Sequence, residues 1–98
     1  MAVTATSLFR GAAATSSTTL YTTTTSTVVT NIAVTNTATA SATFTLTLNG
    51  TGILSGVTIP ANSTAFFDLK QVLASSQIIA GYASATTVNF HVSGVLIV

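Results

Sequence analysis

Alternation of polar and apolar residues is clearest over residues 43–48, where three large apolar side chains recur at every second position between threonines. A period of two predicts a strand with one buried face. Asn49 and Gly50 follow at once, and this dipeptide tolerates the positive φ angles of a tight turn. Residues 51–55 can return as a partner strand, so the sequence predicts a β-hairpin with its turn at Asn49 and Gly50.

Further strands are indicated on both sides of this hairpin. In the segment 28–35, Val28, Ile32 and Val34 are expected to fall on one side of a strand. The threonine run 22–25 supports either a strand end or a loop, because threonine favours extended backbone but gives a core little to bury. The other strand candidates are Leu8-Phe9, Leu20-Tyr21, 64–68, 77–83 and 87–98.

The period changes once, after residue 68. Leu69, Val72 and Leu73 stand at positions i, i+3 and i+4, the spacing of one helix face. Asp68 can act as an N-cap, and Gln71 occupies the matching capping-box position. The spacing therefore predicts a short helical turn over 69–74.

About eight short strands at roughly ten-residue spacing, separated by Gly, Asn and Pro turns, predict an all-β fold. We expect a two-sheet antiparallel β-sandwich of jelly-roll or Ig-like type. Residues 18–98 form its single domain. Residues 1–17 serve either as its first strand or as an N-terminal arm that can extend onto a neighbour.

The composition indicates that much of the surface is covered by other molecules. The chain is 48% hydrophobic and 3% charged, against roughly 25% charged in ordinary domains. A chain of 98 residues also has a thin core, which association can reinforce. Residues 95–98 are apolar on both strand faces and must be sandwiched. The predicted interface residues are Leu8, Phe9, Arg10, Val95, Leu96, Ile97 and Val98.

The same inventory excludes most chemistry. Paired-carboxylate catalysis needs two acids, and Asp68 is the only one. His91 with Asp68 gives two metal ligands at most, so an intrachain metal site is not expected, although copies of His91 could share one across a symmetry axis. No nucleophile elbow or phosphate loop is present, so we expect no catalytic residue and no cofactor. The chain is predicted not to be an enzyme.

Partners of other classes are limited as well. Two basic residues are too few for a phosphate-binding face, so nucleic acid is not expected. No apolar run is long enough to span a bilayer, and no secretory signal is recognisable, so neither membrane insertion nor secretion is expected. Tyr21 and Tyr82 could stack on a sugar ring, although tyrosines in strands more often serve a core or an interface.

Four segments carry a resemblance to a known family. They are Leu20-Tyr21, residues 31–37 (NIAVTNT), residues 55–73 (SGVTIPANST…DLKQVL) and residues 88–95 (VNFHVSGV). From Leu20 onward the chain resembles small proteins encoded among the virion genes of tailed phages and prophages. Relatives often carry a Val-Pro-Ala-Gly-Lys-like turn after Leu-Tyr, where this chain has residues 22–26.

The resemblance implies a non-enzymatic virion structural protein, and foremost a capsid decoration or cement protein that bridges capsomers. It implies a homo-oligomer, expected as a trimer, that is made in the host cytoplasm and binds the major capsid protein or other virion proteins on the capsid surface. A tail, neck or fibre component is an alternative, and so is a module that binds host-surface sugar.

Overall fold

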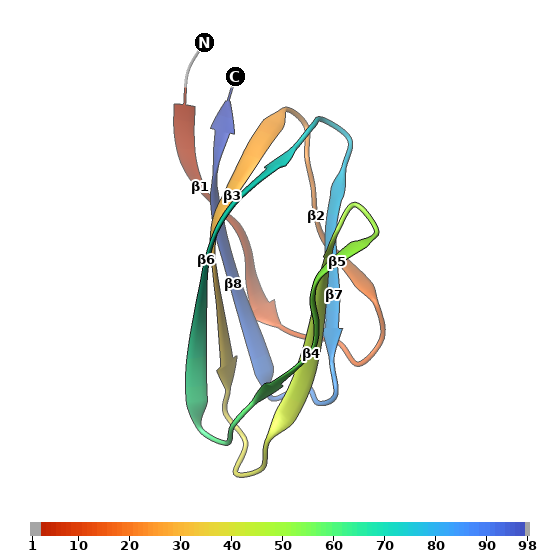
Figure 1. The fold of residues 1–98 in the computed structure, drawn as a ribbon, viewed down its shortest axis with the longest axis vertical. Helices are drawn as coiled ribbons and strands as arrows, with labels where there is room; N and C mark the ends of the chain where they lie inside the picture. Colours follow the sequence, from red (N-terminus) through yellow and green to blue (C-terminus); the bar gives the residue numbers. More distant parts are fainter. Residues whose placement is uncertain (1–2, 98) are drawn as a thin grey trace.

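The computed structural model describes residues 3–97 and arranges them as eight strands in two layers (Figure 1). No helix occurs within these residues. The strands are β1 (Val3–Ala12), β2 (Thr18–Thr22), β3 (Ser26–Asn36), β4 (Ala42–Leu48), β5 (Thr51–Ile59), β6 (Ser63–Leu73), β7 (Ile78–Ala83) and β8 (Val88–Ile97).

The strand order identifies the sandwich as a jelly roll. One four-stranded sheet, here sheet A, has the order β1-β8-β3-β6, and the other, sheet B, has the order β2-β7-β4-β5. All pairs are antiparallel. An Ig-like sandwich would pair its first two strands in one sheet, whereas β1 and β2 lie in different sheets. The predicted two-sheet β-sandwich is therefore confirmed, with the jelly-roll alternative as the one observed.

The core lies between the inner faces of the two sheets. Phe44 of β4 is almost fully buried, and its ring centroid lies 5.9 Å from those of both Phe67 of β6 and Phe90 of β8, edge to face. Such pairs add to the free energy gained by burial alone. These three rings join sheet B to two strands of sheet A.

A β-bulge in β3 changes which side chains face this core. Val29 and Asn31 pair with the adjacent residues Gly94 and Ser93 of β8, so Thr30 is an extra residue in β3. The extra residue reverses the alternation, and Val29 is buried while Val28 lies on the outer face. The prediction that Val28 lies on the same side of the strand as residues 32 and 34 was therefore wrong.

The predicted helical turn over 69–74 was also wrong, because β6 continues as a strand to Leu73. Between Asp68 and Gln71, β6 carries one residue more than the β3 segment opposite, Asn31 to Val29. The alternation continues through β6: Leu69 and Leu73 face the core four residues apart, and the outward Val72 completes the i, i+3, i+4 spacing that imitates a helix face. Asp68 and Gln71 consequently cap no helix. Instead, the Asp68 carboxylate accepts a hydrogen bond of 2.9 Å from the Asn31 side-chain amide.

Buried polar side chains fix the loops at both ends of the sandwich. The threonine run after β2 is a loop in which the Thr23 hydroxyl, 2% exposed, donates to the Ala74 carbonyl at 2.6 Å. At the other end, the fully buried Asn36 side chain donates to the Ala40 carbonyl at 2.8 Å and accepts from the Thr87 hydroxyl at 3.3 Å. Hydrogen bonding of this kind removes the penalty of burying polar groups.

Residues 3–12 form strand β1, which pairs with β8 in the chain's own sheet A and has a bulge at Leu8.

The β4–β5 turn consists of Asn49 and Gly50, with φ angles of 50° and 83°. Among residues 3–97, no helix is long and apolar enough to cross a membrane.

Candidate interaction surface

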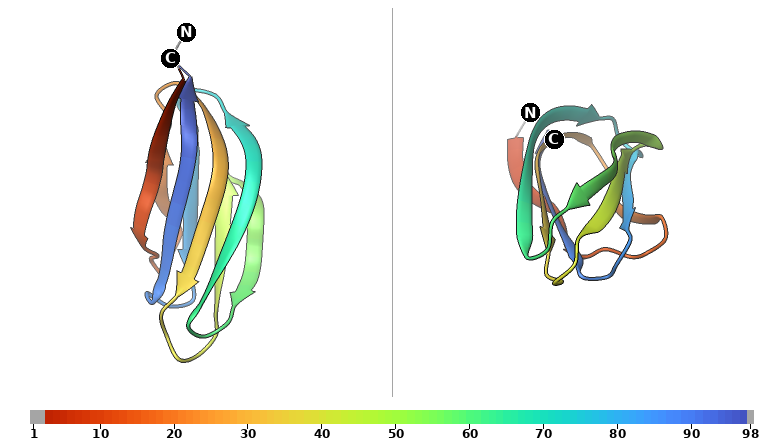
Figure 2. Two further views of the ribbon diagram at one scale, coloured as in Figure 1. Left: turned by 90° about the vertical axis from the view of Figure 1, so that its left-hand side faces the viewer. Right: turned by 60° about the horizontal axis from the view of Figure 1, so that its bottom comes forward.

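The outer face of sheet A carries an apolar row across all four strands. The pairing places Ala5 of β1 beside Val95 of β8, Val95 beside Val28 of β3, and Val28 beside Val72 of β6. We call these four residues the apolar row. The Val72 side chain is 70% exposed. The same face carries the pair Val3 and Ile97. Figure 2 (left) shows β1, β8, β3 and β6 side by side in this sheet.

Two further rows follow on this face. The polar row consists of Ser7, Ser93, Asn31 and Asp68, and the mixed row consists of Arg10, His91, Ala33 and Phe66. Phe66 is 71% exposed. With Lys70, which is exposed on β6, every charged residue of the chain belongs to sheet A. Apolar and charged groups thus occur on the same face.

A hollow of about 400 Å³ lies on this face over β1 and β8. It is lined by Ala5, Thr6, Ser7, Arg10, Thr30, Ser93, Gly94 and Val95. Thr30 is the extra residue of the β3 bulge, and the bulge at Leu8 lies in the same stretch of β1. Bulges bend a strand and increase its local twist, which accounts for a hollow at this point of the sheet. Its lining combines hydroxyl groups with one guanidinium.

The outer face of sheet B is different in kind. Its centre is formed by the threonines at 43, 45 and 47 of β4, which alternate with buried residues. Thr58 pairs with Thr43, and Tyr82, 39% exposed, pairs with Thr45. No residue of the four strands of sheet B is charged.

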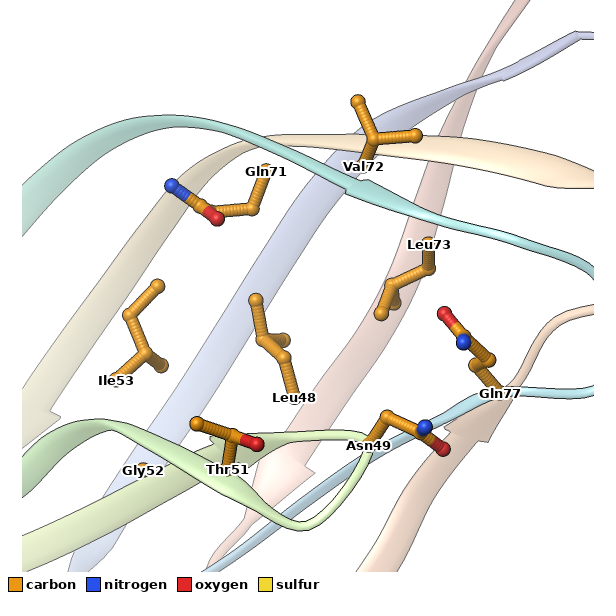
Figure 3. Close-up of a pocket in the computed structure, with 9 residues that line it drawn as sticks. All are labelled: Leu48, Asn49, Thr51, Gly52, Ile53, Gln71, Val72, Leu73 and Gln77. Carbon is orange, nitrogen blue, oxygen red and sulfur yellow. The ribbon is translucent and has the colours of Figure 1, made fainter.

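A cleft of about 480 Å³ opens where the end of β6 faces the β4–β5 hairpin (Figure 3). Leu48 and Leu73 point toward each other across it, whereas Val72 points away. Its lining is Leu48, Asn49, Thr51, Gly52, Ile53, Gln71, Val72, Leu73 and Gln77. None of these side chains is an acid, a base or a strong nucleophile, so the cleft can bury apolar groups but offers no group for catalysis.

The predicted interface residues divide between the two sides of sheet A. Arg10, Val95 and Ile97 lie on the outer face, in three different rows. Phe9 and Leu96 pack against the core. Leu8 is 5% exposed and belongs to the core, so its assignment to an interface was wrong. Val98 lies outside the described residues.

The sequence interpretation missed three outer-face residues: Val28, Phe66 and Val72. Each stands next to another large apolar residue, Val29, Phe67 or Leu73 respectively. Two adjacent residues of a strand point to opposite faces, so one of each pair must face outward. Adjacent apolar residues were therefore the signal that could have revealed this surface.

The two tyrosines do not form one stacking platform. Tyr21 pairs with the buried Ile79 and packs against the core, whereas Tyr82 pairs with Thr45 on the outer face of sheet B. They consequently lie on opposite sides of the same sheet.

Residues 3–97 contain no group of three or more His, Cys, Asp or Glu side chains that could hold a metal ion. His91 and Asp68 stand on β8 and β6, and β3 runs between those two strands. Asp68 also belongs to the polar row and His91 to the mixed row. Within residues 3–97 these two side chains therefore lie apart on the sheet.

Comparison with known proteins finds no family model and no curated protein that matches this chain. Among solved structures, the fold is similar to part of a chain in the crystal structure of the T13 IBDV viral particle. The TM-score is 0.58 at 12% sequence identity, over 97% of this chain and 30% of that chain. The chain thus spans less than a third of that neighbour's length. At this identity the likeness shows the fold alone.

Proposed function

We propose that this chain is a non-enzymatic structural protein of a virus particle, and specifically a decoration or cement protein that bridges capsomers on the capsid surface. The observation that carries the proposal is the outer face of sheet A, which exposes an apolar row together with all the charged residues of the chain. Exposed apolar patches on small proteins mark sites of interaction.

Two similarities support a place in a virus particle. The sequence resembles small virion proteins of tailed phages from Leu20 onward, and the jelly roll is similar to part of a chain from the T13 IBDV viral particle. Jelly rolls also occur in lectins and cupins. The fold alone is therefore weak support for a role in a viral shell. The support is stronger when the exposed face of sheet A is considered with it.

The mechanism is the burial of surface across joints in the shell. Each apolar side chain that leaves water on binding contributes about 25 cal/mol per Å² of buried area. Loss of translational and rotational freedom offsets part of this gain. Many copies on one shell reinforce each other, because a second contact made by a tethered molecule is effectively intramolecular. The activity is thus stabilisation of the particle.

The test is the copy number of this chain relative to the major capsid protein, measured by quantitative mass spectrometry of purified particles. A ratio near one to one is expected. A few copies per particle would move the chain to the tail, neck or fibres, and its absence from the particle would overturn the virion proposal.

An add-back experiment connects the proposal to the surface. Particles stripped of this chain are mixed with the wild-type chain, with Val28→Asp, or with Thr43→Asp as the matched control on sheet B. Val28→Asp is expected to weaken binding at least tenfold, because it places a charge in the centre of the apolar row. Equal binding of the two variants would show that the outer face of sheet A is not the surface used.

A further inference from the structure

We infer that the outer face of sheet A binds the same face of a second copy, about a two-fold axis that runs along the strands between β8 and β3. In this pair, β1 of each copy lies over β6 of the other. The inference rests on the proposed function and deepens it: the pair covers the apolar row of the free chain, and dissociation of the pair opens the same face to the capsid. It also replaces the three-fold assembly that the sequence resemblance implies.

Symmetry and the order of the rows support this arrangement. A two-fold interface uses the same patch on both copies, so the patch must be complementary to itself. A rotation about an axis along the strands leaves the position of each row along the strands unchanged. It reverses the order of the four strands across the face. Ala5 then lies over Val72 of the other copy, and Val95 lies over Val28. The apolar row is therefore covered by the apolar row.

Charges match in the same arrangement. Arg10 on β1 comes to lie over Phe66 on β6 of the other copy, one row away from Asp68. A guanidinium over an exposed aromatic ring and beside a carboxylate gains from both contacts. The Asp68 carboxylate itself comes to lie over Ser7, in the hollow that Arg10 borders. The two-fold axis makes each of these contacts twice.

The other two-fold arrangement is unfavourable. An axis across the strands through the middle of the face would lay the polar row on itself and place Asp68 against Asp68 of the other copy. It would also place Ala5 over Arg10 and Val95 over His91. Like charges brought together at an interface cost several kcal/mol. Charge therefore selects the axis along the strands.

The face is large enough for a modest interface. Four strands about 4.8 Å apart and about ten residues long give a footprint of about 600 Å² per copy. Standard interfaces bury about 800 Å² per partner, so this one lies toward the small end. We therefore expect a dimer that dissociates on dilution. Sedimentation velocity over a wide concentration range measures it, and a chain that stays monomeric at every concentration, or forms trimers, overturns the inference.

Charge reversal tests the predicted contacts. Arg10→Asp and Asp68→Arg are each expected to weaken dimerisation at least tenfold, because each places like charges across the interface twice. The double variant Arg10→Asp/Asp68→Arg keeps the wild-type net charge and is expected to dimerise again. Mixing the two single variants is expected to give a heterodimer. Failure of both the double variant and the mixture to associate would exclude the predicted contacts.

Cross-linking tests the same geometry without changing any charge. The chain has no cysteine, so Ala5→Cys and Val72→Cys each introduce a single thiol. Packed sheets lie about 10 Å apart, a gap that a short bismaleimide can span. Cross-links are expected between the two variants when they are mixed, and not within either variant alone. Links that form equally within Val72→Cys alone would overturn the arrangement.

Controls separate folding from association. Thermal unfolding of each variant shows whether it is folded, and Thr43→Asp on sheet B is expected to dimerise like the wild type. All these measurements use the isolated chain, whereas the proposed function is tested on particles. A dimer that is absent from particles would contradict the proposed function alone, and a particle component that is monomeric in isolation would contradict the pairing alone.

Discussion

The outer faces of the two sheets differ far more than their inner faces do. Both inner faces are apolar and meet in one core. Outside, sheet A carries valines, Phe66 and all the charged residues, whereas sheet B carries mainly threonines, with Ile78 and Tyr82, and no charge. Valine and threonine are both β-branched and both favour strands. The fold can therefore tolerate either outward, and the choice between them determines whether a face is hydrated or covered.

Threonine also explains how a nearly uncharged chain can keep one face free. Its hydroxyl binds water without adding charge, so sheet B can remain in solvent while sheet A is buried against another molecule. A protein that bridges two surfaces needs this difference between its outer faces, because exposed apolar groups on every face would lead to aggregation.

The largest effect is expected from a change in the core, where the inner faces of the two sheets meet. Phe44→Ala empties the centre of the core, where the ring meets those of Phe67 and Phe90. Truncation of a buried phenylalanine costs about 3–5 kcal/mol. Chemical denaturation is expected to show this loss, whereas Thr43→Ala, the adjacent residue on the outer face, is expected to change the free energy of unfolding by less than about 0.5 kcal/mol. Similar losses for the two variants would contradict the assigned faces.

A smaller loss is expected at Gly94, which lies between the core and the apolar row. A Cβ atom added there would lie 2.9 Å from Leu8 Cδ1 and closer still to the Val28 carbonyl oxygen. Such overpacking costs about 1–3 kcal/mol. Gly94→Ala is therefore expected to lower the free energy of unfolding.

Gly11→Ala is the matched control in the same sheet. Its added Cβ would meet only the Phe9 ring, at 3.3 Å, which can move slightly. If Gly11→Ala proved the more destabilising of the two in the same denaturation measurement, the close approach of β8 to β3 at Gly94 would be in doubt.

Alternation within one segment predicted strands well. The hairpin turn at Asn49 and Gly50 and the alternating segment 87–98 were both visible as local signals, and they correspond to the β4–β5 turn and β8. Prediction failed at Thr30 in β3, where a bulge reversed the alternation, and in β6, where the outward Val72 between Leu69 and Leu73 matched the spacing of a helix face. A bulge depends on the neighbouring strand, which a local pattern does not contain.

The candidate surface required still more information. The apolar row joins four strands whose order, β1-β8-β3-β6, runs across the whole sequence. Its members are separated by dozens of residues, and only the register of three strand pairs brings them together. Sequence reasoning identified Arg10 and Val95 individually but could not align them with Val28 and Val72.

Exchange of valine and threonine between the faces tests the comparison with little effect on stability. Val28→Thr with Val95→Thr gives sheet A the character of sheet B, and it is expected to change the free energy of unfolding by about 1 kcal/mol or less. Association measured by sedimentation is nevertheless expected to fall. The converse pair, Thr43→Val with Thr58→Val, adds an apolar patch to sheet B and is expected to create new association. Unchanged association in both variants would mean that this chemical difference does not govern contact.

The smallest effect is expected at Tyr82, the residue of sheet B that departs most from its threonine surroundings. Its side chain is 39% exposed, whereas Tyr21 packs against the core from the other side of the sheet. Tyr82→Ala is therefore expected to change the free energy of unfolding by less than about 0.5 kcal/mol, and Tyr21→Ala by about 2 kcal/mol.

Tyr82→Ala is therefore the better variant for testing whether a tyrosine stacks on a sugar ring, because loss of binding by an unstable Tyr21 variant would be ambiguous. A glycan array is expected to show no binding by either the wild type or Tyr82→Ala. A glycan that binds the wild type and not Tyr82→Ala would give sheet B a ligand of its own, and the contrast would then be between two functional faces.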